Sequence, residues 1–425
     1  MTNAYRNSPK TFRLSKEICK KILIAAAACL VYGVFSGYSG VVSSVIKAAI
    51  YSAGNLPYSE IQTAFTIGTF VAAFAAPVMA IFAMKRSNIQ VLLFGFVMIV
   101  LGTLCLAFTT SFAGLILSVG ILNAVGQSAF AFGLIFSMVS PFLGEKIAII
   151  FSSLLSIFSS VFYVIVTPVT QYMTLSAGLT QTLLIYCGIL ALIFPLSILF
   201  AGKKPPKDKK KEGRKIDIKA GAKTLLKSRL FQLLVLMELV IGLTNGISNH
   251  AYVAMIDLGM AEMEVSYLIS GMKIAGMAGS LLAAAAVLRF KKKFLLGSIL
   301  FGVFALTELG IYFCHMDFTF LVPLLFVGTF LKKFPYTLSD LITRRYFSPM
   351  IIGTLMTILG LFSRIGSGIN SIAGAVVFEY FHSFDLIFLI EGVVGAAGCI
   401  IILVFAVTVG NKLKPYEEQN SEDAQ

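Results

Sequence analysis

Charged side chains are scarce in this sequence. Asp, Glu, Lys and Arg make up 13% of the 425 residues, whereas 58% are hydrophobic and the mean hydropathy is +0.90. Soluble globular chains carry about 25% charged residues, so this chain cannot cover a soluble fold of its size with polar surface. The composition excludes a soluble enzyme, a DNA-binding factor and a disordered scaffold. It leaves a polytopic α-helical membrane protein.

Residues that bind metals or form disulfides are also few. The six cysteines are scattered singly and the three histidines lie far apart, so no metal-ligand spacing and no disulfide framework is visible. The HExxH and GxSxG motifs of membrane enzymes are absent. We therefore expect no enzyme activity, no metal and no cofactor. The net charge of +14 lies in short segments between apolar runs, so we expect no nucleic acid partner either.

Apolar runs long enough to cross a bilayer, about 20 residues each, dominate what is present. The alternating ten-residue segments of a β-barrel do not occur. We predict an all-α membrane protein with twelve transmembrane helices, at 22–48, 60–84, 89–109, 113–140, 147–173, 181–201, 230–256, 264–288, 294–314, 319–342, 351–379 and 386–410.

Lys and Arg alternate in their placement along the chain. Seven segments, namely the two ends and every second connection, hold 29 of the 34 basic residues, whereas the other connections hold none and carry acids instead. By the positive-inside rule both termini are cytoplasmic. We expect a multi-pass protein of the cytoplasmic (inner) membrane.

The chain divides into two halves joined by a basic linker. We predict an N-terminal six-helix half at 1–201 with its cytoplasmic tail, a linker at 202–229, and a C-terminal six-helix half at 230–425. The linker is a topogenic segment, with binding to anionic membrane lipids as the alternative. Similar segments, KRSNIQVLLFG and RFKKKFLLG, follow the second and eighth runs, and their closing glycines Gly95 and Gly297 are 202 residues apart. Two such pseudo-symmetric halves form a cavity at their interface and rock around it.

In this organisation the sequence resembles the major facilitator superfamily over nearly its whole length. The family's signature after the second span is matched by Lys85, Arg86 and the VLLFG that follows, while Ala80 and Met84 stand where the family has a glycine and an acid. The resemblance implies the major facilitator fold and secondary transport by alternating access. We expect a monomer.

Two cations lie within predicted spans of the C-terminal half. Lys273 is in the eighth run and Arg364 in the eleventh, each among small and polar residues. A charge at a helix centre costs about 2.5–3.5 kcal/mol, so such residues face a wet cavity or a partner. An Arg fork and a Lys point charge at matching depth suit carboxylate oxygens. The pair resembles the oxalate:formate antiporter branch of the superfamily and, more loosely, its monocarboxylate carriers. The alternative is that both cations neutralise acids such as Glu238.

Further charges occupy the same half. Lys332 and Lys333 lie in the tenth run, and because successive helical residues point about 100° apart, one of them faces the cavity and the other snorkels or pairs with an acid. Glu238 and Glu308 are candidate proton carriers; Glu238 is the better one, whereas Glu308 and Glu391 lie in spans that are peripheral in the family. Lys47 lies near a span end and is expected to reach the interface.

Neutral polar groups complete the predicted substrate site. They are Tyr32 and Tyr38 of the first run, Asn123 and Gln127 of the fourth, Tyr163 of the fifth, and Asn249 and Tyr252 of the seventh. For each of them a plain interhelical hydrogen bond is the alternative.

The function that fits these residues is transport of a small organic anion, a mono- or dicarboxylate, as an anion exchanger or proton symporter. The main alternative is a proton-coupled carrier of neutral or zwitterionic metabolites such as amino acids. A non-transporting membrane sensor is a remote alternative.

Overall fold

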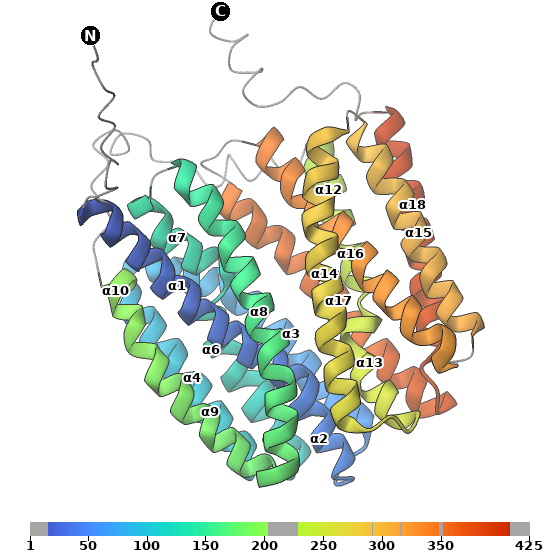
Figure 1. Cartoon of the computed structure of the whole chain (residues 1–425), viewed down its shortest axis with the longest axis horizontal. Coiled ribbons are helices and arrows are strands. Elements are labelled where there is room, and N and C mark those ends of the chain that lie inside the picture. Colours follow the sequence, from blue (N-terminus) through green and yellow to red (C-terminus); the bar gives the residue numbers. More distant parts are fainter. Residues whose placement is uncertain are drawn as a thin grey trace, which may run out of the picture.

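A computed structural model gives the architecture of the chain (Figure 1). It describes residues 16–143, 145–202, 228–290, 292–314, 317–347 and 352–408. These residues are helical apart from short connections, and no strand occurs among them. The predicted all-α fold is thereby confirmed. Most of the linker that we placed at 202–229, namely 203–227, lies outside the described residues.

The N-terminal half crosses the bundle six times. The first crossing combines α1 (Lys16–Val41), the π-helical turn η1 (Val42–Ile46) and α2 (Lys47–Ser52), and the fourth and sixth crossings are likewise interrupted. The other elements in order are α3 (Tyr58–Lys85), α4 (Asn88–Phe108), α5 (Phe112–Leu115), η2 (Ile116–Asn123), α6 (Ala124–Ala129), α7 (Phe132–Leu143), α8 (Glu145–Ala177), α9 (Leu179–Ile193), η3 (Phe194–Ser197) and α10 (Ile198–Ala201).

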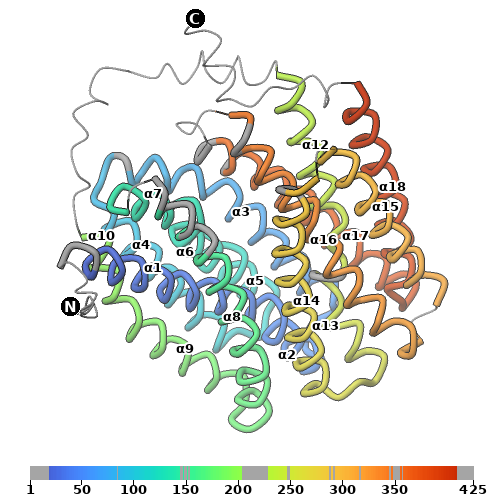
Figure 2. The backbone as a smooth tube through the Cα atoms, turned by 45° about the horizontal axis from the view of Figure 1, so that its top comes forward, coloured from blue at the N-terminus to red at the C-terminus, as the bar shows by residue number. Residues whose placement is uncertain are grey.

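The C-terminal half also crosses six times and lies beside the first half (Figure 2). Its elements are α12 (Arg229–Leu243), α13 (Gly246–Asp257), α14 (Glu262–Arg289), α15 (Lys293–Phe313), α16 (Phe318–Tyr346), α17 (Ile352–Phe381) and α18 (Asp385–Thr408). We call the end of the bundle where α1 begins and α18 ends the terminal face. The end near α2 and the loop after α13 is the opposite face (Figure 1).

The predicted seventh run, 230–256, is not one helix. It breaks after Leu243 into α12 and α13, because Thr244 and Asn245 leave helical geometry. Neither piece is long enough to span alone, so eleven helices of the described residues have the length and apolarity of a membrane span. Together α12 and α13 make the seventh crossing, which brings the total to twelve. The prediction of twelve crossings holds, but the expectation of an unbroken seventh span is wrong.

The internal repeat is visible in equivalent close contacts. A Cβ atom at Gly95 of α4 would overlap Ala129 of α6, which belongs to the fourth crossing. A Cβ atom at Gly297 of α15 would overlap Leu338 of α16, the tenth crossing. The two glycines therefore let the third and ninth crossings approach their next neighbours in the same way, as expected for two pseudo-symmetric halves.

Large apolar side chains cover the outside of the bundle. Leu192 of α9 is 77% exposed and Val407 of α18 is 70% exposed. In water such a surface would be costly, whereas hydrocarbon chains solvate it. Buried polar side chains are hence found between helices, where they define the candidate site.

Candidate functional site

Lys273 projects from the C-terminal half onto the N-terminal half. Its Nζ lies 4.7 Å from the centre of the Tyr163 ring, in cation–π geometry. Ser270, one turn earlier on α14, donates its hydroxyl to the Val164 carbonyl of α8 at 3.1 Å. The ring of Tyr163 in turn packs against Gly40 of α1, where a Cβ atom would overlap it. Three crossings thus place one ammonium group against one aromatic face.

Glycines of α14 bring α16 close behind Lys273. A Cβ atom at Gly279 would overlap the Phe330 carbonyl oxygen, and one at Gly276 would lie 3.2 Å from Cε of Lys333. The Lys333 Nζ lies 5.7 Å from the Tyr336 ring centre. The close approach puts Lys273 within electrostatic range of Lys333 and Lys332. Cations from two helices therefore gather beside Tyr163.

Arg364 also faces the N-terminal half, but at a different depth along the bundle than Lys273. It is exposed although it lies in the middle of α17, and it is within electrostatic range of Tyr32 of α1. Tyr32 and Gly40 are eight residues apart on α1, about 12 Å along the helix axis. Arg364 therefore meets α1 about two turns closer to the terminal face than Lys273 does.

These cations lack acidic partners within the part of the chain that the structure describes. The charged groups that act on Lys273 are two further lysines, and the group that acts on Arg364 is the Tyr32 phenol. Glu238, the acid that we considered as their neutralising partner, is buried beside Ser339 and Ser363. The positive charge of the site is thus available to a ligand.

Lys332 points elsewhere than Lys333, as their helical spacing predicts. It is 4% exposed and donates to the Thr244 carbonyl and, at 2.6 Å, to Oδ1 of Asn245. It is also within electrostatic range of Glu308 and Glu391. Lys332 therefore belongs to the break between α12 and α13 rather than to the group around Lys273.

Side chains replace the backbone hydrogen bonds that the break removes. Asn370 donates to the Leu243 carbonyl at 3.0 Å and to Oε1 of Glu391 at 2.5 Å, and Glu391 accepts the Gly246 N–H. A cation and an amide thus face the carbonyl end of α12, and a carboxylate faces the amino end of α13, which matches both helix dipoles. Irregular backbone at membrane depth requires such compensation.

The same break carries Asn249 into the contact between the halves. Its Nδ2 donates to Oδ1 of Asn370 at 3.0 Å, and its carbonyl accepts Nζ of Lys47 at 2.6 Å. Lys47 also donates to Oε1 of Gln62 at 3.0 Å and is only 3% exposed. Our expectation that Lys47 reaches the interface is therefore wrong. The reason is that α2 continues past it toward the opposite face, where α13 packs over it.

Further hydrogen bonds join the two halves near the opposite face. The Tyr58 hydroxyl pairs with Nδ1 of His250 at 2.9 Å, and the Tyr51 hydroxyl donates to Asp257 at 3.3 Å. Tyr252, a predicted site residue, donates to Gln171 at 2.8 Å, and Gln171 donates to Glu262 at 2.6 Å. We call the contacts of Lys47, Tyr51, Tyr58 and Gln171 with the other half the inter-half contact.

Three predicted site residues point into the N-terminal half instead. Tyr38 is buried and pairs with Thr103 at 2.5 Å, and Asn123 donates to the Ser118 carbonyl at 3.2 Å. Gln127 accepts a hydrogen bond from Ser39. The structure does not bring these residues to Lys273 or Arg364. Tyr38 and Gln127 make the plain interhelical contact that we named as their alternative, whereas the Asn123 bond lies within η2.

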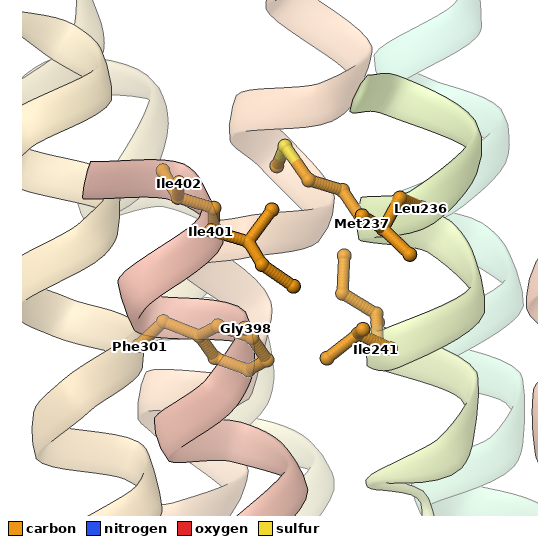
Figure 3. A pocket seen from close by; sticks show the side chains of 8 residues that line it. Leu236, Met237, Ile241, Phe301, Gly398, Ile401 and Ile402 are labelled. Atoms are coloured by element: carbon orange, nitrogen blue, oxygen red, sulfur yellow. The ribbon is translucent and has the colours of Figure 1, made fainter. Parts of the chain in front are cut away.

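One crevice elsewhere in the bundle does not suit a charged ligand. A crevice between α12, α15 and α18 is lined by apolar side chains, among them Leu236, Met237 and Phe301 (Figure 3). Among the described residues, no three His, Cys, Asp or Glu side chains are arranged to hold a metal ion. The group of Lys273, Lys333, Arg364, Tyr32 and Tyr163 remains the candidate substrate site.

Comparison with known proteins identifies the family. The sequence model of the Major Facilitator Superfamily matches residues 24–253 and 234–423. The chain belongs to the Major Facilitator Superfamily. The first matched segment covers the N-terminal half and extends into α13, and the second begins within α12 and covers the rest of the C-terminal half. No curated protein matches the sequence.

Solved structures of superfamily type share the fold at low sequence identity. A mutant of the nucleoside transporter NupG is 14% identical, with a TM-score of 0.72 over 91% of this chain and 99% of that one. A POT family transporter in complex with 5-aminolevulinic acid is 14% identical, with a TM-score of 0.72 over 90% and 96%. A D-xylose–proton symporter is 13% identical, with a TM-score of 0.69 over 90% and 97%.

Proposed function

We propose that this protein is a secondary active transporter that moves a small organic anion across the cytoplasmic membrane by alternating access. The observation that carries the proposal is the group of cations beside Tyr163. Lys273 has lysines as its charged neighbours, and no acid pairs with Lys273 or Arg364 among the described residues. Desolvated charges of one sign are costly unless a counter-charge arrives, and an anionic substrate is such a counter-charge.

The presence of two cations that face the N-terminal half favours a substrate with two anionic groups. Arg364 lies beside Tyr32 and Lys273 beside Tyr163, at levels of α1 about 12 Å apart along its axis. One carboxylate can accept the Arg fork while a second meets the Lys273 ammonium. Two cations without acidic partners among the described residues can meet two such groups, which supports a dicarboxylate over a monocarboxylate. This arrangement gives less support to an amino acid, whose ammonium group would need an acid nearby.

The contacts between the halves support alternating access with the opposite face closed. Lys47, Tyr58 and Gln171 bond across the halves near that face, while Arg364 on the terminal side is exposed. The basic segments of the chain place the terminal face in the cytoplasm. With the terminal face on the cytoplasmic side, the candidate substrate site opens to the cytoplasm.

Counterflow in proteoliposomes tests the proposal. Vesicles loaded with one unlabelled compound are given the labelled compound outside, with monocarboxylates, dicarboxylates, amino acids and nucleosides compared in turn. We expect uptake for dicarboxylates, loss of that uptake in Lys273→Gln, and normal uptake in Lys20→Gln, which removes an exposed lysine at the start of α1. Uptake of neutral or zwitterionic compounds alone would contradict the assignment of an organic anion.

A further inference from the structure

Glu308 of α15 is a buried acid without a hydrogen-bond partner. It is 0% exposed, and within the described ranges neither of its carboxyl oxygens has a partner. Glu391 of α18 is equally buried, and its Oε2 also lacks one. The two acids lie within electrostatic range of each other. Two ionised carboxylates in such a place would repel each other and remain unsolvated.

Lys332 is the cation that faces both acids. It is within electrostatic range of Glu308 and Glu391, and the other charged group acting on it is Lys333. With Lys332 charged, one ionised carboxylate balances it and the second carries an excess negative charge. One proton removes that excess, and a pair of carboxyl groups sharing a proton is the usual solution.

Lys332 and Glu391 also hold the break in the seventh crossing. Lys332 donates to the Thr244 carbonyl at the end of α12, and Glu391 accepts the Gly246 N–H at the start of α13. Three residues after Gly246, the Asn249 carbonyl accepts a hydrogen bond from Lys47 of the other half. A change of charge on the acids therefore alters the electrostatic interactions at the end of α12 and at the start of α13. Both helix ends lie about one turn from the inter-half contact.

We propose that Glu308, Glu391 and Lys332 form a proton-binding site whose occupancy governs the α12–α13 break and, through it, the inter-half contact. The ligand is a single exchangeable proton, shared by the two carboxyl groups. When the proton leaves, the excess negative charge draws Lys332 toward the acids and away from Thr244. The carbonyl end of α12 then loses its cation, and α13 is released to move with Asn249.

The site deepens the proposed function, on which its transport role rests, by naming the coupling ion and its place. It is proposed in place of Glu238, which we considered the better proton carrier, because Lys332 and Glu391 bond at the break whereas Glu238 is buried beside Ser339 and Ser363.

Infrared spectroscopy of the purified full chain tests proton binding without any substrate. The C=O band of protonated carboxyl groups is followed from acid to alkaline pH for wild type, Glu308→Gln, Glu391→Gln and Glu238→Gln. We expect a titrating component in wild type that both Glu308→Gln and Glu391→Gln remove or shift, because the two groups share the proton. Glu238→Gln should retain it. If the titrating band is unchanged in Glu308→Gln, the proposed proton site is wrong. The proposal is also wrong if wild type shows no titrating band.

Two further variants keep the result interpretable. Glu308→Leu removes the acid without removing a hydrogen bond, so it serves if Glu308→Gln does not fold. Thr307→Val changes the neighbouring buried residue of α15 and should leave the component unchanged. Replacing sodium by choline at constant pH should also leave it unchanged, and a component that follows sodium would overturn the proton as ligand.

Transport then shows whether the proton is coupled. In proteoliposomes Glu308→Gln should retain counterflow of the substrate but lose accumulation driven by a pH gradient. Full gradient-driven accumulation in Glu308→Gln would refute the coupling role. Absence of counterflow in wild type for every compound tested would instead refute the proposed function, and the infrared result would stand by itself.

Discussion

Lys273 shows how a single desolvated charge can be held in place without an acid. Its ammonium group rests on the Tyr163 ring at 4.7 Å, and the ring is wedged against Gly40. The negative face of the ring offsets part of the cost of desolvation, by about 0.5–2 kcal/mol. The aromatic ring does not neutralise the ammonium group, so its positive charge stays available to a ligand. An ion pair with an acid would neutralise it.

Replacing the Tyr163 ring should therefore destabilise the ligand-free protein. Tyr163→Phe keeps the aromatic face and loses the 3.1 Å hydrogen bond to Ser44, whereas Tyr163→Leu loses the face as well. We expect Tyr163→Leu to unfold at a clearly lower temperature than Tyr163→Phe when both are heated in detergent. Identical unfolding temperatures for the two variants would show that Lys273 gains nothing from the ring.

At the scale of elements, the break between α12 and α13 lies next to the inter-half contact, because Asn249 of α13 accepts Lys47. Glu391 and Gly246 are central to it, because a Cβ atom at Gly246 would overlap the Glu391 carboxylate. The break needs a residue without a side chain at that point.

Gly246→Ala should cost about 1–3 kcal/mol, the usual range for overpacking a tight contact. The matched control is Gly188→Ala in α9, where a Cβ atom meets nothing within 4 Å and alanine favours the helix by up to about 1 kcal/mol. Thermal unfolding of both variants measures the difference. Equal stability of the two would indicate that the Gly246–Glu391 contact is loose.

Hydropathy and charge were sufficient to predict the twelve crossings and their division into two halves. The break was not predictable in this way, because residues 230–256 form one apolar run, and the Thr244-Asn245-Gly246 segment is a weak signal. The partners of Lys332 were also hidden, since Glu391 and Asn370 are distant in sequence. Lys273 and Arg364 stood out because charges in apolar runs are rare. Lys47, at the end of such a run, did not.

At the scale of the whole molecule, the inter-half contact joins the two halves near the opposite face. Lys47, Tyr51, Tyr58 and Gln171 all reach across from the N-terminal half toward α13 or the start of α14. Alternating access requires these bonds to open and others to form on the terminal side. A transport cycle is thus blocked if they cannot separate.

Tethering this contact should stop transport. Tyr51 and Asp257 are joined by a 3.3 Å hydrogen bond, so cysteines at both positions, in a chain whose native cysteines are replaced, can be linked by a short bifunctional thiol reagent. We expect the linked protein to lose counterflow and to recover it when a cleavable reagent is reduced. The single variant Tyr51→Cys, treated in the same way, should keep its activity. Undiminished counterflow in the linked protein would contradict closure at this face.

The central claim, that Lys273 and Arg364 hold an anionic substrate, is tested most directly by measuring the affinity of the purified protein for dicarboxylates by titration calorimetry. Losing one partner of a buried charge pair costs about 2–5 kcal/mol, so Lys273→Gln should weaken binding by roughly thirty-fold to several thousand-fold. Arg364→Gln should also weaken binding, by a smaller factor, because Arg364 is exposed. Arg364→Lys keeps the charge without the fork and should weaken it less, while Lys20→Gln should have no effect. Wild-type affinity in both Lys273→Gln and Arg364→Gln would contradict the account, because the two cations would then be structural.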